Sequence, residues 1–326
     1  MNFDTYLINN REYTGLLPLA KEFDFHPEKN YLFDLSYLAM LSVIGVRAEE
    51  FLQGQLSCDI RQVSPAVMRQ GAMCNLKGRI LALLDVIQWH QFQLILPKDL
   101  LSDTKNSLAK TAMLSRVILE PAYSYQIYGF YLNNPDDLLP GNIRPETARF
   151  AAIQTEEFCC YSLGHNLFIF LIKQEKIPSF INTFKENQQI RGSLAWHYLQ
   201  LTHKQVQIYP QTRGLFLPHR LDLHLSGHLN FNKGCYKGQE IIARTHYRAK
   251  LKHGLRLFTI ETEKPLHTGQ KLLEPSSGVE IGELVDFCPL GAQQHLIAAS
   301  ILFEHPAKVH IENHKDPVKI NPVIKQ

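Results

Sequence analysis

The segment NKGCYKGQEIIAR, from Asn232 to Arg244, brings two glycines, a cysteine and two lysines together within a few residues. Gly234 and Gly238 permit backbone conformations that are closed to other residues. From Gln239 onward, a carboxamide and a carboxylate are followed by aliphatic residues that can continue as a helix. The segment therefore predicts a tight loop that leads into a helix.

Cys235 lies just before the predicted helix, between Lys233 and Lys237. The positive end of a helix dipole and two nearby ammonium groups stabilise a thiolate. These neighbours favour Cys235 as a reactive thiol. The alternative is a buried, inert cysteine in a turn, which is the commoner state of a cysteine in a folded protein. The residues of this segment alone leave both interpretations open.

The whole chain has the composition of an ordinary globular protein. Its 326 residues include 34 Lys and Arg against 31 Asp and Glu, so the formal net charge is +3. That length suits two or three modules. Affinity for a polyanion comes mostly from clustered cations, so the near-neutral balance argues against a general duplex-binding surface and against a DNA partner.

The N-terminus and the apolar runs predict a cytoplasmic protein with no membrane partner. Residues 1–10 lack the charged and apolar regions of a secretory signal. The longest apolar runs, such as residues 167–172, have the length of a strand and cannot span a bilayer. Six cysteines are sparse for this length and are expected as thiols, with the adjacent Cys159 and Cys160 packed in a strand.

Hydrophobic periodicity shifts repeatedly between two and 3.6 residues, which indicates α+β modules. Helices are predicted over residues 48–56, 99–114, 178–186, 194–201 and from 239 onward. Strands are predicted over residues 80–89, 92–96, 117–119, 124–131, 150–153, 158–163, 167–172, 255–262, 280–287 and 295–300. Turn-forming residues predict a long connection near 133–148. The last group of strands predicts a small β-barrel or sandwich.

The octapeptide KGCYKGQE at residues 233–240 resembles the signature K-G-C-Y-x-G-Q-E of the YgfZ family, folate-binding relatives of the T protein of the glycine cleavage system. The segments FLQGQ at 51–55 and KGR at 77–79 resemble two further family motifs. Trp196 and residues 216–218 fall in family-like positions. The resemblance covers roughly residues 35–258, and the signature is specific because it fixes most of its positions.

The resemblance implies a T-protein-like fold with three modules around a central channel: ferredoxin-like α/β modules and a C-terminal β-barrel. We therefore expect a folate-binding region over residues 1–245, made of two interleaved α+β modules, and a barrel over residues 246–326. The implied ligand is tetrahydrofolate or another reduced folate. The implied role is the maintenance of iron-sulfur enzymes, including those that thiolate tRNA. The net charge of +3 favours an indirect effect on tRNA through these client proteins.

Candidate site residues follow from the same resemblance. Cys235 is implied as the functional thiol, with Lys233 beside it. The residues implied in folate binding are Gln53, Gln55, Lys77, Arg79, Trp196, Thr202, Gln239, Arg244 and Arg248. Positive charge from Lys233, Arg244 and Arg248 suits the glutamate tail of a folate or another small anion. The alternative for these cations is solvated surface charge.

The first departure from the T-protein pattern concerns an aspartate. T proteins that transfer an aminomethyl group carry G-G-x-I-D-D or a close variant in a hairpin, and an aspartate there assists attack by the folate amine. Leu81 and Ala82 occupy the acidic positions here. Asp85 lies three residues beyond Ala82, so strand alternation directs it to the opposite face. The pattern therefore argues against aminomethyltransferase activity.

The second departure concerns the pterin ring. The family usually places a glutamate six residues after Trp196, and this chain has Thr202 there. Losing a charge-assisted hydrogen bond costs on the order of 1.5 to 3 kcal/mol. We therefore expect Thr202 to weaken pterin recognition.

Other chemistry has weaker support. His219, His224 and His228 precede Cys235, but their spacing fits no compact ligand motif, so no metal site is predicted. A Cys-His hydrolase that pairs Cys235 with His246 lacks an oxyanion signature. Two hypotheses stand beside the YgfZ-like accessory protein. One is a folate-dependent aminomethyltransferase or related one-carbon transferase with an acidic group from another module, and the other is an interaction protein with a vestigial channel.

Overall fold

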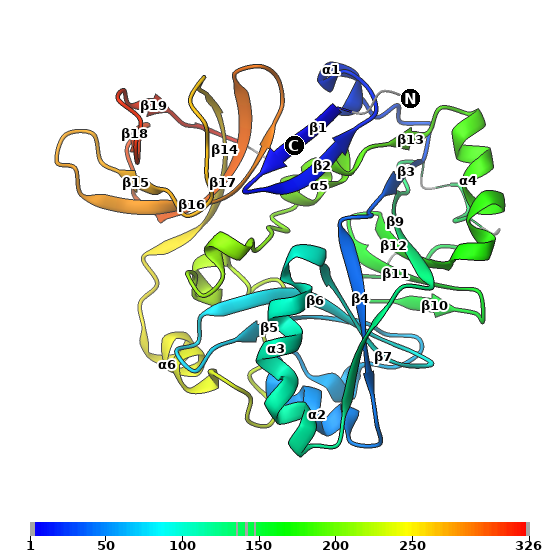
Figure 1. Ribbon diagram of the computed structural model, residues 1–326. Coiled ribbons are helices and arrows are strands. Elements are labelled where there is room, and N and C mark those ends of the chain that lie inside the picture. Colours follow the sequence, from blue (N-terminus) through cyan, green and yellow to red (C-terminus); the bar gives the residue numbers. More distant parts are fainter. Residues whose placement is uncertain (1–3, 135, 141–142, 147, 324–326) are drawn as a thin grey trace.

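The structure is a computed structural model that describes residues 4–134, 136–140, 143–146 and 148–323. Three β-sheets, a two-stranded hairpin and six α-helices make up these residues. The three sheets are grouped around a common centre (Figure 1). The mixed α+β class predicted from the periodicity is confirmed. Within the described ranges, no helix has the length and apolar character needed to cross a membrane.

The five-stranded sheet carries the hairpin in which the T-protein aspartate was expected. Its order is β5 (Arg69–Cys74), β6 (Ile80–Trp89), β7 (Gln91–Pro97), β4 (Leu38–Ile44) and β8 (Ile118–Ala122), with α2 (Ala48–Gln55) after β4 and α3 (Lys98–Leu114) after β7. The order β6-β7-β4-β8 with these two helices is that of a ferredoxin-like module, to which β5 adds an edge. Buried and half-buried residues alternate along most of β6, so the strand has two distinct faces.

The six-stranded sheet is covered on both faces. Its order is β10 (Ala152–Gln154), β11 (Phe158–Gly164), β12 (Leu167–Lys173), β9 (Tyr125–Tyr131), β3 (Tyr31–Asp34) and β13 (Ile190–Arg191). Aromatic residues of α4 (Ile177–Glu186) pack on one face, against Phe130 and Phe170. On the other, Trp196 of α5 (Ser193–Thr202) lies so close to Gly129 that a Cβ at position 129 would overlap its ring. Strand β3 precedes the five-stranded sheet in sequence, so the two modules interleave.

The C-terminal sheet has seven antiparallel strands that form a nearly closed β-barrel. Its order is β19 (Val318–Lys319), β18 (Lys308–Ile311), β15 (Lys271–Leu273), β16 (Glu280–Pro289), β17 (Gln294–Leu302), β14 (His253–Glu261) and β20 (Asn321–Pro322). Helix α6 (Gln239–Arg248) precedes it. The module boundary predicted between residues 245 and 246 falls inside this helix, and the first barrel strand begins at His253.

An N-terminal hairpin, β1 (Asp4–Ile8) and β2 (Arg11–Gly15), followed by α1 (Leu19–Glu22), lies beside the barrel (Figure 1). Arg11 forms a salt bridge with Asp99 at the start of α3, 2.8 Å between nitrogen and oxygen. Asn9 pairs with Thr268 at the barrel, where the Thr268 backbone N–H donates to Asn Oδ1 at 3.0 Å. The hairpin therefore connects the five-stranded module to the barrel.

Most of the elements predicted from periodicity are present. The four helices predicted upstream of the signature correspond to α2, α3, α4 and α5, and the predicted helix start at residue 239 coincides with α6. The predicted connection near 133–148 lies partly outside the described residues. Several short strands were not predicted, namely β1, β2, β3, β4, β5, β13, β15, β18, β19 and β20. The described residues also form four 3-10 helices: η1 (Ile60–Gln62), η2 (Gln174–Lys176), η3 (Pro210–Thr212) and η4 (Pro218–Leu221).

Candidate functional site

The signature loop, residues 233–240, is fixed to the five-stranded module at two points. The Lys233 ammonium donates to the backbone carbonyls of Gln53, Leu56 and Cys58 at 2.9, 2.6 and 2.7 Å. Gly238 has a φ of +84° and lies against the turn that contains Gly78, which has a φ of +69°. The predicted tight turn is therefore present.

Lys233 is a structural residue in this arrangement. All three of its N–H donors are used by carbonyls around the end of α2, and the side chain is buried. Burial lowers the pKa of this lysine to about 8, so the ammonium form still predominates at neutral pH. All of its donors are therefore occupied by backbone carbonyls, and the expectation that Lys233 assists the thiol stays a prediction.

Cys235 differs from every other cysteine of the chain in being exposed. The remaining five are buried as free thiols. Burial raises the pKa of Cys58, Cys74 and Cys159 to about 12, which keeps them protonated and unreactive. Adjacent Cys159 and Cys160 lie in β11 without a bridge, as predicted. Accessibility therefore leaves Cys235 as the thiol that a partner or small molecule can reach.

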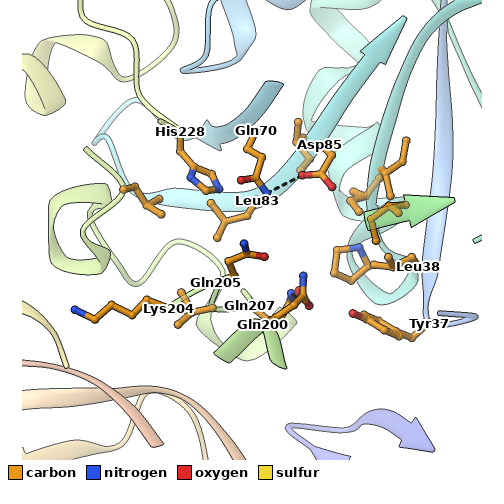
Figure 2. A pocket seen from close by; sticks show the side chains of 17 residues that line it. Tyr37, Leu38, Gln70, Leu83, Asp85, Gln200, Lys204, Gln205, Gln207 and His228 are labelled. Carbon is orange, nitrogen blue, oxygen red and sulfur yellow. Dashed lines mark hydrogen bonds between the residues drawn. The ribbon is translucent and has the colours of Figure 1, made fainter. Parts of the chain in front are cut away.

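A cavity lies between the five-stranded sheet, β12 of the six-stranded sheet and the segment that follows α5, and we call it the Asp85 cavity. Gln70, Leu83 and Asp85 from β5 and β6 lie on one side, and three glutamines from α5 and the following segment lie across from them (Figure 2). Its lining includes Tyr37, Gln70, Leu83, Asp85, Ile95, Gln200, Gln205, Val206, Gln207 and His228.

Asp85 lies in this cavity, which bears on the inference that the hairpin offers no carboxylate to a site. The alternation along β6 does place Asp85 and Ala82 on opposite faces. The face of Ala82, however, is the hydrophobic core, where Ala82 is fully buried. The face of Leu83 and Asp85 lines the cavity. The hairpin therefore supplies a carboxylate to the cavity, two residues beyond Leu83.

The Asp85 carboxyl group is held by two neutral donors. Gln70 Nε2 donates to Oδ1 and the Tyr161 hydroxyl donates to Oδ2, each at 3.0 Å. Burial raises the pKa of Asp85 to about 6, although both hydrogen bonds and the nearby Arg149 favour the charged form. A carboxyl group with this pKa exchanges a proton readily near neutral pH, which suits a general acid or base.

His228 contributes a neutral imidazole to the same cavity. Its Nδ1 lies 2.8 Å from the Ser226 hydroxyl. Burial, together with the nearby charge of Arg149, lowers the pKa of His228 to about 3. Near neutral pH the protonation of Asp85 therefore changes, whereas His228 stays uncharged.

Two buried oxygen atoms of the lining have no hydrogen-bond partner within the described residues: Gln205 Oε1 and the Tyr37 hydroxyl. Unpaired buried polar atoms cost about 1 to 3 kcal/mol each, so such atoms in a cavity indicate that a bound molecule satisfies them. The pyrimidine edge of a pterin offers N–H donors, which match the acceptors of Asp85 and Gln205. Apolar side chains of Leu83, Ile95 and Val206 match its ring faces.

The cavity is narrow for a complete folate. Its volume is about 60 Å³. The chemical character of the lining fits a pterin, and its present width does not.

The residues that the resemblance implied in folate binding do not line this cavity. Trp196 is fully buried against Phe33, with ring centroids 5.3 Å apart. The Thr202 hydroxyl donates to the Leu199 carbonyl of its own helix at 2.7 Å. Their implied contact with a pterin stays a prediction.

The other implied residues surround the signature loop rather than the cavity. Gln53 donates to Asp59 and accepts from the Ile60 backbone, so it closes the end of α2. Arg79 donates to the Leu215 carbonyl. The remaining residues of this set lie near α2, the β5–β6 turn and α6: Gln55, Lys77, Gln239, Arg244 and Arg248. The structure thus separates a loop with an exposed thiol from a cavity with a buried carboxyl group.

Sequence reasoning missed the glutamines of the cavity. Gln200 is on α5, and Gln205 and Gln207 follow it in a segment that contains no motif. The one available signal is the alternation of glutamine and aliphatic residues over 205–208, QVQI. Among the histidines and carboxylates of the described ranges, no group of three or more is arranged to hold a metal ion.

Replacing Asp85 with asparagine is expected to change the pH dependence of stability. The folded-state pKa of about 6 lies above that of an unfolded aspartate, so the wild-type protein loses stability as pH rises from about 4 to 6. Allowing for partial exposure, the loss is about 2 kcal/mol. Asparagine does not titrate, so the free energy of unfolding of Asp85→Asn keeps its value while that of the wild type falls. Relative to wild type, the variant should therefore be about 2 kcal/mol more stable at about pH 7.5 than at about pH 4. Urea unfolding at both values measures the difference, and an equal difference at the two pH values would contradict it.

The fold is that of a glycine cleavage T protein. The structure of glycine cleavage system aminomethyltransferase T from Bartonella henselae superposes with a TM-score of 0.74 over 98% of this chain and 92% of that chain, at 14% sequence identity. Sequence comparison finds similarity to proteins named YgfZ. The tRNA-modifying protein YgfZ of Colwellia psychrerythraea is 23% identical over 74% of this chain and 75% of its own length. The YgfZ protein of Photobacterium profundum is 26% identical over 74% and 73%.

The resemblance to the YgfZ family is therefore confirmed, and this chain is a relative of those proteins built on the T-protein fold. No family model matches the chain. The coarse part of the expected architecture, a mixed α+β fold with a C-terminal barrel, is confirmed with it.

Proposed function

We propose that this chain is a YgfZ-like accessory protein that supports tRNA modification. In this proposal it binds a reduced folate in the Asp85 cavity and uses the exposed thiol of Cys235 in the maintenance of iron-sulfur enzymes, including enzymes that thiolate tRNA. Similarity to relatives described as tRNA-modifying proteins supports the role. The observation that carries the ligand is the Asp85 cavity, in which a carboxyl group and an unpaired amide oxygen are available to N–H donors.

Different lining residues would contact different parts of a folate. Asp85 and Gln205 would accept hydrogen bonds from the pyrimidine edge, and Leu83 and Val206 would cover the ring faces. Gln70 and Tyr161 keep the Asp85 carboxyl group in one orientation. A reduced folate, when bound, supplies a carrier for one-carbon units. Arg244 and Arg248 remain candidates for the glutamate tail, since both are exposed cations near the signature loop.

Calorimetric titration of the reduced protein with tetrahydrofolate tests the ligand. We expect micromolar binding by the parent protein. Asp85→Asn should weaken it about tenfold, because a neutral acceptor replaces a charge-assisted one. Lys105→Gln is the control, since this exposed residue is not part of the cavity lining, and it should leave the affinity unchanged. Thr202→Glu tests the separate expectation that Thr202 weakens pterin recognition. Absence of binding by the parent protein, or recovery only in Thr202→Glu, would overturn the assignment of folate to this cavity.

Complementation tests the thiol. In a strain that lacks its own YgfZ protein, the parent chain is expected to restore tRNA thiolation, and Cys235→Ala is expected to abolish this rescue. Cys159→Ala is the control because that thiol is buried in β11 and protonated. Both variants should fold normally by circular dichroism. Full rescue by Cys235→Ala would contradict a role for this thiol.

A second function, folate-dependent one-carbon transfer, gains support from Asp85. The argument against it depended on a hairpin without a carboxylate on the site face, and it does not hold if the Asp85 cavity is the folate site. An assay of an aminomethyl donor with tetrahydrofolate separates the two functions. Robust turnover by the parent protein that is lost in Asp85→Asn would establish a transferase in place of an accessory protein.

A further inference from the structure

A second pocket, separate from the Asp85 cavity, lies between the end of α6 and the start of the barrel. We call it the α6 pocket. Its volume is about 260 Å³, and its lining includes His219, Arg220, Thr245, Lys250, Lys252 and His253. No acidic residue is among the residues that line it. The pocket is therefore suited to an anion.

Positive charge is concentrated in the segment that leads into this pocket, although one of its lysines, Lys233, is buried against α2. Residues 232–252 contain six Lys and Arg against one acidic residue, Glu240, although the whole chain has an excess of only three. Lys250 and Lys252 are exposed, and no carboxylate in the described part of the chain pairs with either. Arg220 is already committed to Glu283 and Ser300. The two lysines are thus the cations available to a ligand.

His219 supplies an unused donor. Its side chain is only 2% exposed, yet neither ring nitrogen has a hydrogen-bond partner among the described residues. Its ring packs near those of His224 and His246, with centroids 4.9 and 5.8 Å away. Burial and these neighbours lower the pKa of His219 to about 4, so the ring is neutral and carries one N–H. A bound oxyanion would satisfy this buried donor.

We propose that the α6 pocket binds a phosphate group of an RNA backbone, held by Lys250, Lys252 and the ring of His219. Phosphate contacts of this kind determine where a protein sits on a nucleic acid without reading its sequence. The proposal rests on the proposed role in tRNA modification, which it extends to direct contact with RNA. Net charge alone predicted an indirect effect, but net charge does not describe a surface on which the cations are concentrated in one segment.

An exposed aromatic ring beside the pocket favours RNA over a free phosphate ligand. Tyr247 is 68% exposed and lies two residues beyond Thr245 of the pocket lining. Phe231 and His246 support it edge-on, with ring centroids 6.0 and 4.9 Å away. Unpaired bases stack on such rings in single-stranded RNA recognition. Arg244 and Arg248 on α6 extend the basic surface on the same helix.

Fluorescence anisotropy with a labelled single-stranded RNA and the full chain tests the proposal. The double variant Lys250→Gln with Lys252→Gln is expected to bind at least about tenfold more weakly at about 0.1 M salt. Its salt dependence should become shallower by about 1.4 in log–log slope, because about two phosphate contacts are lost. The control is Lys105→Gln with Lys110→Gln on α3, two exposed lysines far along the chain, which should bind as the parent does.

Two further variants identify the source of the phosphate. Tyr247→Ala should weaken RNA binding about tenfold without changing competition by inorganic pyrophosphate. His219→Phe, checked for an unchanged melting temperature, should weaken both. Equal RNA binding by the parent and the double lysine variant would overturn the proposal that the α6 pocket binds a phosphate group. Pyrophosphate binding that depends on the lysines, with no effect of Tyr247→Ala on RNA, would overturn the assignment to RNA. The assay contains neither folate nor client proteins, so its failure leaves the titration and the complementation results standing.

Discussion

Gly238→Ala is expected to lower the free energy of unfolding by about 3 kcal/mol, combining the cost of a left-handed conformation for alanine with that of a steric overlap. Gly238 has a φ of +84°, where a side chain is strained. An added Cβ would also overlap the carbonyl oxygen of Asn75 and crowd Gly78 in the neighbouring turn. Neither neighbour can move away at low energetic cost, because both contacts are to backbone atoms. Urea unfolding followed by circular dichroism measures the change.

Gly234→Ala is the matched control for this variant. Gly234 lies in the same loop, but its φ is not positive and a Cβ there would meet nothing within 4 Å. We expect its stability to stay within about 0.5 kcal/mol of wild type. Equal unfolding midpoints for the two variants would show that contact between the signature loop and the Gly78 turn does not stabilise the fold.

Lys233→Met should destabilise the protein by about 3 kcal/mol and reduce rescue in complementation through loss of folded protein. The substitution keeps most of the side-chain volume but removes the donor that three carbonyls share. Burying those carbonyls without a donor costs more than is gained by removing a partly desolvated charge. Thermal and urea unfolding of the purified variant measure the loss.

Lys237→Met provides the comparison, since the Lys237 side chain has no hydrogen bond or ion pair among the described residues and only its backbone N–H bonds to the Gly54 carbonyl. Its stability should stay near that of wild type. If Lys233→Met unfolds at the wild-type midpoint but loses rescue, Lys233 acts in the chemistry of Cys235 and not in holding α2.

Local features of the fold could be predicted because they depend on neighbouring residues. The turn at Gly238 and the start of α6 follow from glycine and from helix propensity. The β6–β7 hairpin follows from alternation around His90, whose φ is +60°. In contrast, β3 has four residues and pairs with β9, which begins at Tyr125, so its local pattern carried no information about its partner.

The residues of the candidate site could be predicted only in part, because their surroundings also depend on distant parts of the chain. Alternation correctly separated Asp85 from Ala82, but the packing of the other modules determines which face of a strand meets a cavity and which meets the core. Lys233 shows the same limit. Its position beside Cys235 in sequence suggested a shared chemical role, but gave no sign of the three backbone carbonyls around the end of α2 that accept from its ammonium.

The N-terminal hairpin affects the order in which parts of the chain reach their final contacts. Asn9 and its partner Thr268 are 259 residues apart in sequence. At about 5 to 20 residues per second, a ribosome needs about 10 to 50 s to deliver the partner after the hairpin has been synthesised. During that interval β1 and β2 have no barrel to join. The earliest part of the chain is therefore among the last to reach its final contacts, and the three modules are completed as one unit only near the end of translation.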